Sequence, residues 1–335
     1  PEALARTPGD YVNLTGKGEL WPGKSRTGQR LKKAVWARAK TDGDAAALDR
    51  SSDTTMFYRW LMILLSATMG WQEVGGTGFA KNTESDLERT VCGVLREPFA
   101  FWSFRLAAGA PDAKRLRGID NIERLSFTTR DGRSLGGYKL RAVKPWGYLL
   151  VAQGNAMLAD HIIGEFQSFR DLGLEVYIYD YRGYGLSDGK SRLKALVSDY
   201  REIIRALNAK DHGRRFLYGI SMGGIILLDA AGKTRDHDAA VIDSSPSRIS
   251  PLGCPEEYDP VNHLPRDCSR IKIIIGLRDG VVPRTDIEEL ASIAQSRGAE
   301  VLEQPEFAHP FQDLSLEIHR RRFQEVADFL TRWRP

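Results

Sequence analysis

The sequence has few cysteines and no dense cluster of metal-binding residue types. Its three cysteines, Cys92, Cys254 and Cys268, form no CxxC pair, and its six histidines show no HExxH spacing. A disulfide-dense mini-fold and a metal site are therefore not expected, and no cofactor is predicted. With 335 residues, 42% of them hydrophobic and 27% charged, the chain can instead bury a large core.

The chain also lacks an excess of positive charge over most of its length. The formal net charge is +4, but residues 1–55 hold ten Lys and Arg against seven Asp and Glu. The other 280 residues therefore carry a net charge of only +1, which is too small to steer nucleic-acid phosphates. We expect no nucleic-acid partner.

The N-terminal region lacks sustained hydrophobic periodicity until residue 56. We interpret residues 1–55 as a non-native or disordered leader, because the first methionine is Met56. The apolar run that follows is too short to span a bilayer comfortably but suits the core of a signal peptide. Residues 56–80 are therefore a candidate signal peptide, with a hydrophobic helix as the alternative. Export (periplasmic, secreted or membrane-associated) is the favoured localisation, and a cytoplasmic one is the alternative.

Two further features bear on location and partners. Cys254 and Cys268 enclose 13 residues, so a disulfide between them is the expectation in an oxidising compartment, and two buried free thiols are the alternative. Residues 81–120 are expected to form an N-terminal extension that includes the aromatic segment 96–104, REPFAFWSF. We interpret this segment as a buried helix, with an acyl site or a peripheral membrane contact as the alternatives.

From residue 121 onward, the hydrophobic pattern predicts one α/β domain that extends to residue 335. A hairpin is expected first, around Asp131 and Gly132. Continuous apolar strands then alternate with amphipathic helices, which is typical of a mostly parallel, doubly wound sheet. Strands are expected at 147–153, 174–181, 214–219, 239–243, 271–276 and 299–304, and helices at 157–173, 192–208, 222–232, 285–297 and 317–333. Chemistry is expected where the carboxyl ends of the strands meet.

One strand–turn–helix junction carries a G-x-S-x-G motif. Gly219, Ser221 and Gly223 follow the strand RRFLY and precede the helical run IILLDAA. This context is typical of a nucleophile elbow, in which glycines allow close backbone approach and the serine is raised on a sharp turn. We therefore predict Ser221 as a catalytic nucleophile. The N–H of Met222, at the start of the helix, is predicted to help form an oxyanion hole.

A serine nucleophile needs a general base and an acid that orients it. In the chain order serine, acid, histidine, the candidates are Asp279, after the strand at 271–276, and His309, after the strand at 299–304. Asp243, at the end of its own strand, is the alternative acid. The second oxyanion donor is predicted to be the N–H of Asn155, in a turn that Gly154 permits.

Five short segments together resemble the α/β-hydrolase superfamily, in particular small serine hydrolases that carry HGNA and DYRGYGxSxG. They are QGNA (153–156), DYRGYGLSDG (180–189), GISMGG (219–224), RDGVVP (278–283) and AHPF (308–311). The resemblance covers roughly residues 123–333 and implies an α/β-hydrolase fold that hydrolyses an ester, thioester or amide through an acyl-enzyme. Gln153 replaces the usual histidine of HGNA, which puts the packing of that loop in doubt.

The sequence therefore predicts a serine hydrolase, an esterase, lipase-like enzyme or thioesterase, that acts on a small-molecule acyl substrate. Residues 244–269 contain five prolines and predict a short, stiff lid. Two alternatives stay open: a catalytically silent binding protein on the same fold, and an amide or peptide hydrolase with the same triad. Nucleotide binding is not favoured, because GYGLSDGKS at 183–191 has the wrong glycine spacing for a phosphate loop.

Overall fold

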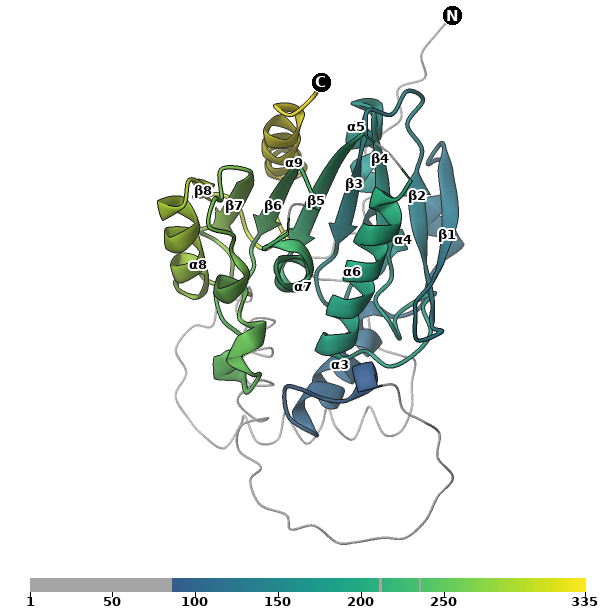
Figure 1. The fold of residues 1–335 in the computed structure, drawn as a ribbon. Helices are drawn as coiled ribbons and strands as arrows, with labels where there is room; N and C mark the ends of the chain where they lie inside the picture. Colours follow the sequence, from purple (N-terminus) through teal and green to yellow (C-terminus); the bar gives the residue numbers. More distant parts are fainter. Residues whose placement is uncertain (1–85, 211–212, 235) are drawn as a thin grey trace, which may run out of the picture. The chain divides into compact units, whose positions relative to one another are not determined.

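The computed structural model describes residues 86–335 except 211–212 and 235 (Figure 1). The predicted leader at 1–55 and the candidate signal peptide at 56–80 lie outside the described residues. Within the part of the chain that is described, no helix is long and apolar enough to cross a membrane.

The described chain forms an eight-stranded sheet in the order β1-β2-β4-β3-β5-β6-β7-β8. The pairs β1–β2 and β2–β4 are antiparallel, and each of the other neighbouring pairs is parallel. The strands are β1 (Ile122–Thr128), β2 (Ser134–Leu140), β3 (Gly147–Ala152), β4 (Leu174–Tyr179), β5 (Arg214–Ile220), β6 (Ala239–Asp243), β7 (Ile271–Gly276) and β8 (Glu300–Gln304). The predicted mostly parallel sheet is confirmed, because β3, β4, β6 and β7 are buried at every residue, as continuous apolar runs require.

Helices cover both faces of this sheet (Figure 1). Successive strand residues point to opposite faces: Leu150 packs with α6 and α7, whereas Leu149 and Val151 pack with α5 and α9. Helix α8 lies on the α7 side, where Leu228 of α7 shares a cluster with Ile287 of α8. The helices are α4 (Ala159–Ile162), α5 (Gln167–Asp171), α6 (Leu193–Asn208), α7 (Met222–Ala231), α8 (Arg284–Ser296) and α9 (Leu316–Thr331). The layers are those of a doubly wound α/β fold.

The segment 157–173 differs from its prediction as one continuous helix. It is divided into α4, the 3₁₀ turn η3 (Ile163–Phe166) and α5. Gly164 lies in the 3₁₀ turn, and a Cβ there would lie 3.2 Å from Cδ1 of Ile119. Glycine is a poor helix former, so the helix tightens at the point where the backbone packs closely on the preceding segment.

Residues 86–120, the described part of the predicted extension, pack against the α/β domain. They contain η1 (Asp86–Glu88), α3 (Arg96–Ala108) and η2 (Ala113–Leu116). The buried carboxylate of Glu97 accepts hydrogen bonds from the backbone N–H groups of Val91, at 2.6 Å, and Leu193, at 2.8 Å. Because Leu193 begins α6, one carboxylate joins the start of α3 to the main domain.

The segment 244–269, predicted to be a lid and called the lid segment below, consists of three short 3₁₀ turns joined by extended chain. They are η4 (Ser250–Leu252), η5 (Glu256–Tyr258) and η6 (Pro260–His263). Asp259 holds the segment together, because its carboxylate accepts hydrogen bonds from the N–H groups of Ile249 and Ser250, both at 2.8 Å. The segment therefore has local order without long helices.

The predicted disulfide between Cys254 and Cys268 is wrong. Cys254 is bonded to Cys92, 162 residues earlier, and Cys268 is a buried free thiol. Cys268 lies just before β7, where its Sγ donates to the carbonyl oxygen of Pro265 at 3.4 Å. Cys254 lies earlier in the lid segment and packs against the hydrophobic cluster that contains Cys92. The short spacing between Cys254 and Cys268 favoured a bond between them, but the fold places Cys92 of the N-terminal extension next to Cys254 of the lid segment.

A double variant, Cys92→Ser with Cys254→Ser, is expected to lower the free energy of unfolding by about 2–5 kcal/mol, because a link across so many residues restricts the unfolded chain strongly. Denaturant unfolding measures this loss. Cys268→Ser is the matched control and is expected to keep the bond. A peptide map without reductant that contains a Cys254–Cys268 pair would contradict the assignment.

Candidate active site

Ser221 occupies a sharp turn between β5 and α7. Its backbone has φ 53° and ψ −117°, a conformation that costs energy for any residue except glycine. Two contacts hold this turn: the N–H of Ser221 donates to the carbonyl oxygen of Asp243 at 2.8 Å, and the Ser245 hydroxyl donates to the carbonyl oxygen of Ser221 at 2.7 Å. The end of β6 therefore fixes the strained turn, and the Ser221 residue remains only half-buried.

The glycines on either side of Ser221 are needed for close packing. A Cβ at Gly219 would lie 2.6 Å from the Cα of Gly224, and a Cβ at Gly223 would overlap the carbonyl oxygen of Ala152 at the end of β3. Side chains at these positions would force strand and helix apart. This is the tight strand–turn–helix junction that the motif predicts.

His309 and Asp279 are in direct contact. Nδ1 of His309 lies 2.8 Å from Oδ2 of Asp279, and both residues are buried. The other carboxylate oxygen of Asp279 accepts hydrogen bonds from the N–H groups of Val281 and Val282, each at 2.8 Å. The carboxylate is thus fully engaged and can orient the ring of His309.

The charge state of Asp279 suits this task. Burial alone would raise the pKa of Asp279, but the hydrogen bond and the charge interaction with His309, with the N–H of Val282 and the Ser244 hydroxyl, hold this pKa below its usual value. An ionised carboxylate can only accept, so Nδ1 of His309 carries the proton and Nε2 has a free lone pair in the neutral ring.

Asp243, the alternative acid, has different partners. Its carboxylate accepts hydrogen bonds from the Tyr218 hydroxyl at 2.9 Å and from Nη1 of Arg322 at 2.8 Å. Burial raises the pKa of Asp243, and the charge of Arg322 opposes this rise. Asp243 therefore balances a buried guanidinium, whereas Asp279 contacts the candidate base.

Arg322 on α9 anchors the loop that carries His309. Its guanidinium is fully buried and donates to the carbonyl oxygen of Ala308 and to the carboxylate of Asp313. Asp313 in turn accepts from the N–H of Ala308 at 2.9 Å. Sequence reasoning missed this role. The available signal was an arginine on the apolar face of the last helix, at helical spacing from Val326 and Leu330.

His319 adds a pH-dependent contact to the same network. Its ring nitrogens lie 3.8 Å from Asp313 and 3.5 Å from Glu165. Burial alone would lower the pKa of His319, but the interactions with Asp313 and Glu165 raise it to about 9. A raised pKa in the folded state stabilises the fold below the unfolded pKa, and this stabilisation is lost as the pH rises towards 9.

The free energy of unfolding is therefore expected to fall by up to about 3 kcal/mol between pH 6.5 and pH 9 through His319. Denaturant titrations at several pH values measure this slope. His319→Gln removes the titrating group and should flatten the curve in this window. Equal slopes in the variant and the parent protein would show that His319 is not the source.

The loop after β3 packs against the Ser221 turn. A Cβ on Gly154 would lie 3.7 Å from the Cβ of Ser221 and 3.1 Å from Sδ of Met157. The side-chain oxygen of Asn155 accepts a hydrogen bond from the Tyr184 hydroxyl at 2.8 Å. The predicted oxyanion loop is thus next to the predicted nucleophile, and Tyr184 fixes its Asn155 side chain.

Gln153, the departure from the HGNA pattern, is buried in the core with its Oε1 lacking a hydrogen-bond partner among the described residues. Its side chain is fully buried, and Nε2 donates to the carbonyl oxygen of Tyr179 at 3.0 Å. The backbone carbonyl oxygen of Gln153 accepts a hydrogen bond from the hydroxyl of Tyr181. The loop is therefore tied to the end of β4 through Gln153 itself.

The DYRGYG segment supports the site without contributing to its chemistry. The buried guanidinium of Arg182 binds the carboxylates of Asp131, Asp199 and Glu88, which come from the β1–β2 turn, α6 and the extension. Sequence reasoning did not single out Arg182. A buried arginine with three acidic partners holds these elements around the loop that follows β4.

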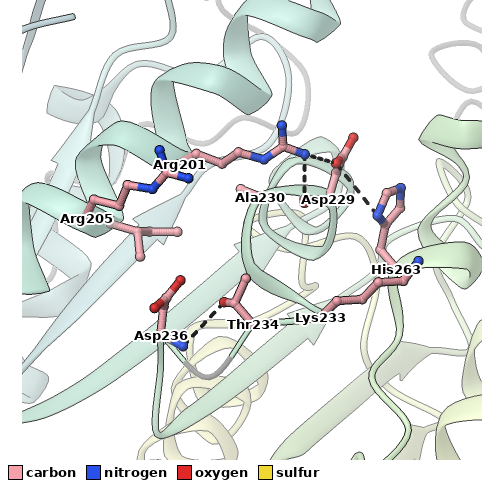
Figure 2. Close-up of a pocket in the computed structure, with 9 residues that line it drawn as sticks. Arg201, Arg205, Asp229, Ala230, Lys233, Thr234, Asp236 and His263 are labelled. Carbon is pink, nitrogen blue, oxygen red and sulfur yellow. Dashed lines mark hydrogen bonds and ion pairs between the residues drawn. The ribbon is translucent and has the colours of Figure 1, made fainter. Parts of the chain in front are cut away.

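The hollow in Figure 2, about 340 Å³, lies at the other end of α7 from Ser221. Arg201 and Arg205 of α6 point into it, and Arg201 pairs with Asp229, which also lies 3.7 Å from His263. The C-terminal part of α7 contributes to its wall, whereas Ser221 precedes the first residue of that helix. This hollow is therefore separate from the candidate active site.

Comparison with known proteins agrees with this geometry. Residues 144–256 match a family described as serine aminopeptidase, S33. The match includes Asn155 and Ser221 and ends before Asp279 and His309. An uncharacterized membrane protein of Saccharomyces cerevisiae is 29% identical over 219 residues, covering 59% of this chain and 76% of that protein. Alpha/beta hydrolase domain-containing protein 17C of Xenopus tropicalis is 26% identical over 226 residues, covering 62% and 67%.

Solved structures share the fold. The esterase Pf2001 of Pyrococcus furiosus matches with a TM-score of 0.53 and 17% identity, over 68% of this chain and 97% of that one. The alpha/beta hydrolase GrgF of a Penicillium species matches with a TM-score of 0.51 and 17% identity, over 64% and 99%. These likenesses confirm the predicted fold, because they cover 97% and 99% of the two solved structures.

Proposed function

Because the chain belongs to the α/β-hydrolase superfamily and is serine-hydrolase-like, we propose that it cleaves a carboxylic ester or thioester through an acyl-enzyme. The observation that carries this proposal is the contact between Asp279 and His309. This pair lies next to the end of β6, because the Ser244 hydroxyl interacts with Asp279, and the carbonyl oxygen of Asp243 at that end accepts the N–H of Ser221. The esterase Pf2001 of Pyrococcus furiosus shares the fold on which this chemistry is proposed. Nucleophile, acid and base follow one another along the chain in the superfamily's order.

In the proposed mechanism, Oγ of Ser221 attacks the acyl carbonyl carbon while Nε2 of His309 takes the hydroxyl proton. The carbonyl π electrons move onto oxygen, and the N–H groups of Met222 and Asn155 stabilise this negative charge. Asp279 keeps the ring in the required tautomer and stabilises its charged form. His309 then gives the proton to the leaving alcohol or thiol as the bond to the acyl carbon breaks.

Water completes the cycle by the same steps. His309 removes a proton from a water molecule as its oxygen attacks the acyl carbon of the ester on Ser221. The second tetrahedral intermediate collapses, the carboxylic acid leaves, and Oγ of Ser221 recovers its proton from His309. Each step uses only groups of this chain, the substrate and water.

A fluorophosphonate probe tests this proposal. Oγ of Ser221 should attack phosphorus and release fluoride, so that a stable adduct forms on the peptide containing Ser221. Ser221→Ala should abolish labelling, and Ser269→Ala, at an exposed serine far along the chain, is the matched control. An unlabelled parent protein would instead support the catalytically silent binding protein.

Peptide or amide hydrolysis by the same residues is the second candidate, supported by the serine aminopeptidase description of the matching family. An aryl ester and the aryl amide of the same acyl group distinguish the two. Turnover of the amide that Ser221→Ala abolishes would favour the peptidase, and hydrolysis of the ester without turnover of the amide would favour the esterase.

We also propose that the protein is exported, because the Cys92–Cys254 bond suits an oxidising compartment.

A further inference from the structure

Helix α3 has apolar side chains on two opposite faces. Phe101 and Ala108 point inward and are buried. On the outer side lie four large apolar residues, which we call the α3 stripe: Leu95 (83% exposed), Phe99 (40%), Trp102 (50%) and Leu106 (59%). Their spacings of four, three and four residues place them on one line along the helix. The expectation of a simply buried helix at 96–104 is therefore wrong for this outer face.

Such a stripe is unusual on a soluble surface. Large apolar residues that are exposed singly are common, but a contiguous set marks an interaction site. The rings of Phe99 and Trp102 lie 5.6 Å apart, so the stripe is continuous at its centre. Val94, just before the helix, is also exposed, at 78%.

The stripe lies at the edge of the sheet where the candidate active site is found. Phe101 shares a cluster with Met222 and Tyr184, which flank the nucleophile and the oxyanion loop. Nη1 of Arg96 donates to the carbonyl oxygen of Leu252 in the lid segment, at 2.5 Å. Figure 1 shows α3 beyond the ends toward which the arrows of β3 and β5 point.

One exposed basic residue lies on α3 itself, and further exposed basic residues follow it along the chain. Arg105, Lys114 and Arg117 are exposed in or just after α3. Of the two acidic residues between 96 and 117, Glu97 is buried and Asp112 is half-buried and accepts a hydrogen bond from the N–H of Lys114, whereas Asp120, just beyond this stretch, is exposed. An apolar, aromatic line with basic neighbours is typical of a helix that lies in the interface of an anionic bilayer.

We propose that the α3 stripe docks the protein on an anionic lipid surface, with the ring of Trp102 and the side chain of Leu106 at the boundary between headgroups and acyl chains. Arg105, Lys114 and Arg117 contact lipid phosphates. A second copy of the chain fits less well, because a symmetric contact would bring the same basic residues together. Resting on the proposed function, this docking brings the acyl group of a membrane lipid to the edge that carries Ser221.

A fluorophore at Leu106 tests the docking in the full chain. Leu106→Cys carries an environment-sensitive label, and labelling is selective because Cys92 and Cys254 are bonded and Cys268 is buried. Vesicles of phosphatidylcholine with phosphatidylglycerol should shift the emission to the blue, and phosphatidylcholine alone should shift it less. The matched control is Val143→Cys, 89% exposed on the loop before β3, where no shift is expected.

The double variant Phe99→Ser with Trp102→Ser is expected to lower the vesicle partition coefficient by about tenfold, whereas Val143→Ser leaves it unchanged. Both chains keep the apolar run at 56–71, so its contribution cancels. Three results would overturn the proposal: no vesicle-induced shift at position 106, an equal shift at position 143, or a shift that follows protein concentration without lipid, which would indicate a second copy. None of these measurements depends on catalytic activity, so their outcome is independent of the outcome of the hydrolase proposal.

Discussion

Ser221→Ala is expected to lower kcat for ester hydrolysis by about 10⁶-fold, the loss found when a triad nucleophile is removed from a serine hydrolase. The physical reason is that alanine has no hydroxyl to form the acyl-enzyme. The proposed oxyanion donors, the N–H groups of Met222 and Asn155, remain and are expected to support only slow attack by water. Steady-state assays with an activated aryl ester measure this difference.

The stability of this variant provides its control. Ser221→Ala keeps the backbone N–H that bonds to the carbonyl oxygen of Asp243, so the denaturant midpoint should change little. A variant that is folded and almost inactive supports the nucleophile assignment. A folded variant with near-normal turnover would refute it.

Asp279→Asn is expected to lower kcat by about 10⁴-fold with only a moderate change in stability. The asparagine amide would present either its N–H₂ group or a neutral oxygen to Nδ1 of His309. The ring is then no longer held by a carboxylate in the tautomer whose Nε2 can accept a proton. The N–H groups of Val281 and Val282 would still find an oxygen at this position. Turnover and unfolding are both measured for this variant.

Asp243→Asn provides the contrasting result. This change leaves the buried guanidinium of Arg322 with one negative charge fewer, and breaking a buried ion pair costs about 3–5 kcal/mol. We expect a large loss of stability and, in the folded fraction, a smaller loss of turnover than for Asp279→Asn. The opposite ranking of the two turnover losses would identify Asp243 as the orienting acid.

The sequence predicted the layers because hydrophobic periodicity is a local property. Continuous apolar runs such as residues 271–276 can be stable only when both faces are covered, and β7 is indeed buried throughout. The G-x-S-x-G junction was equally local, since the glycines at 219 and 223 are required by atoms within one turn or on the neighbouring strand. The order of strands then puts the loops that follow β5, β6 and β7 at one edge.

By itself, then, the sequence determined the α/β class, the strained turn at Ser221 and the candidate residues Asp279 and His309. Only the tertiary structure decided which carboxylate contacts the imidazole, which cysteine bonds to Cys254, and which face of α3 is exposed. These features depend on residues that are far apart in the chain, such as Cys92 and Cys254. Periodicity and motif spacing describe neighbours along the backbone, whereas pairing across such separations is set by how the packed layers bring distant segments together.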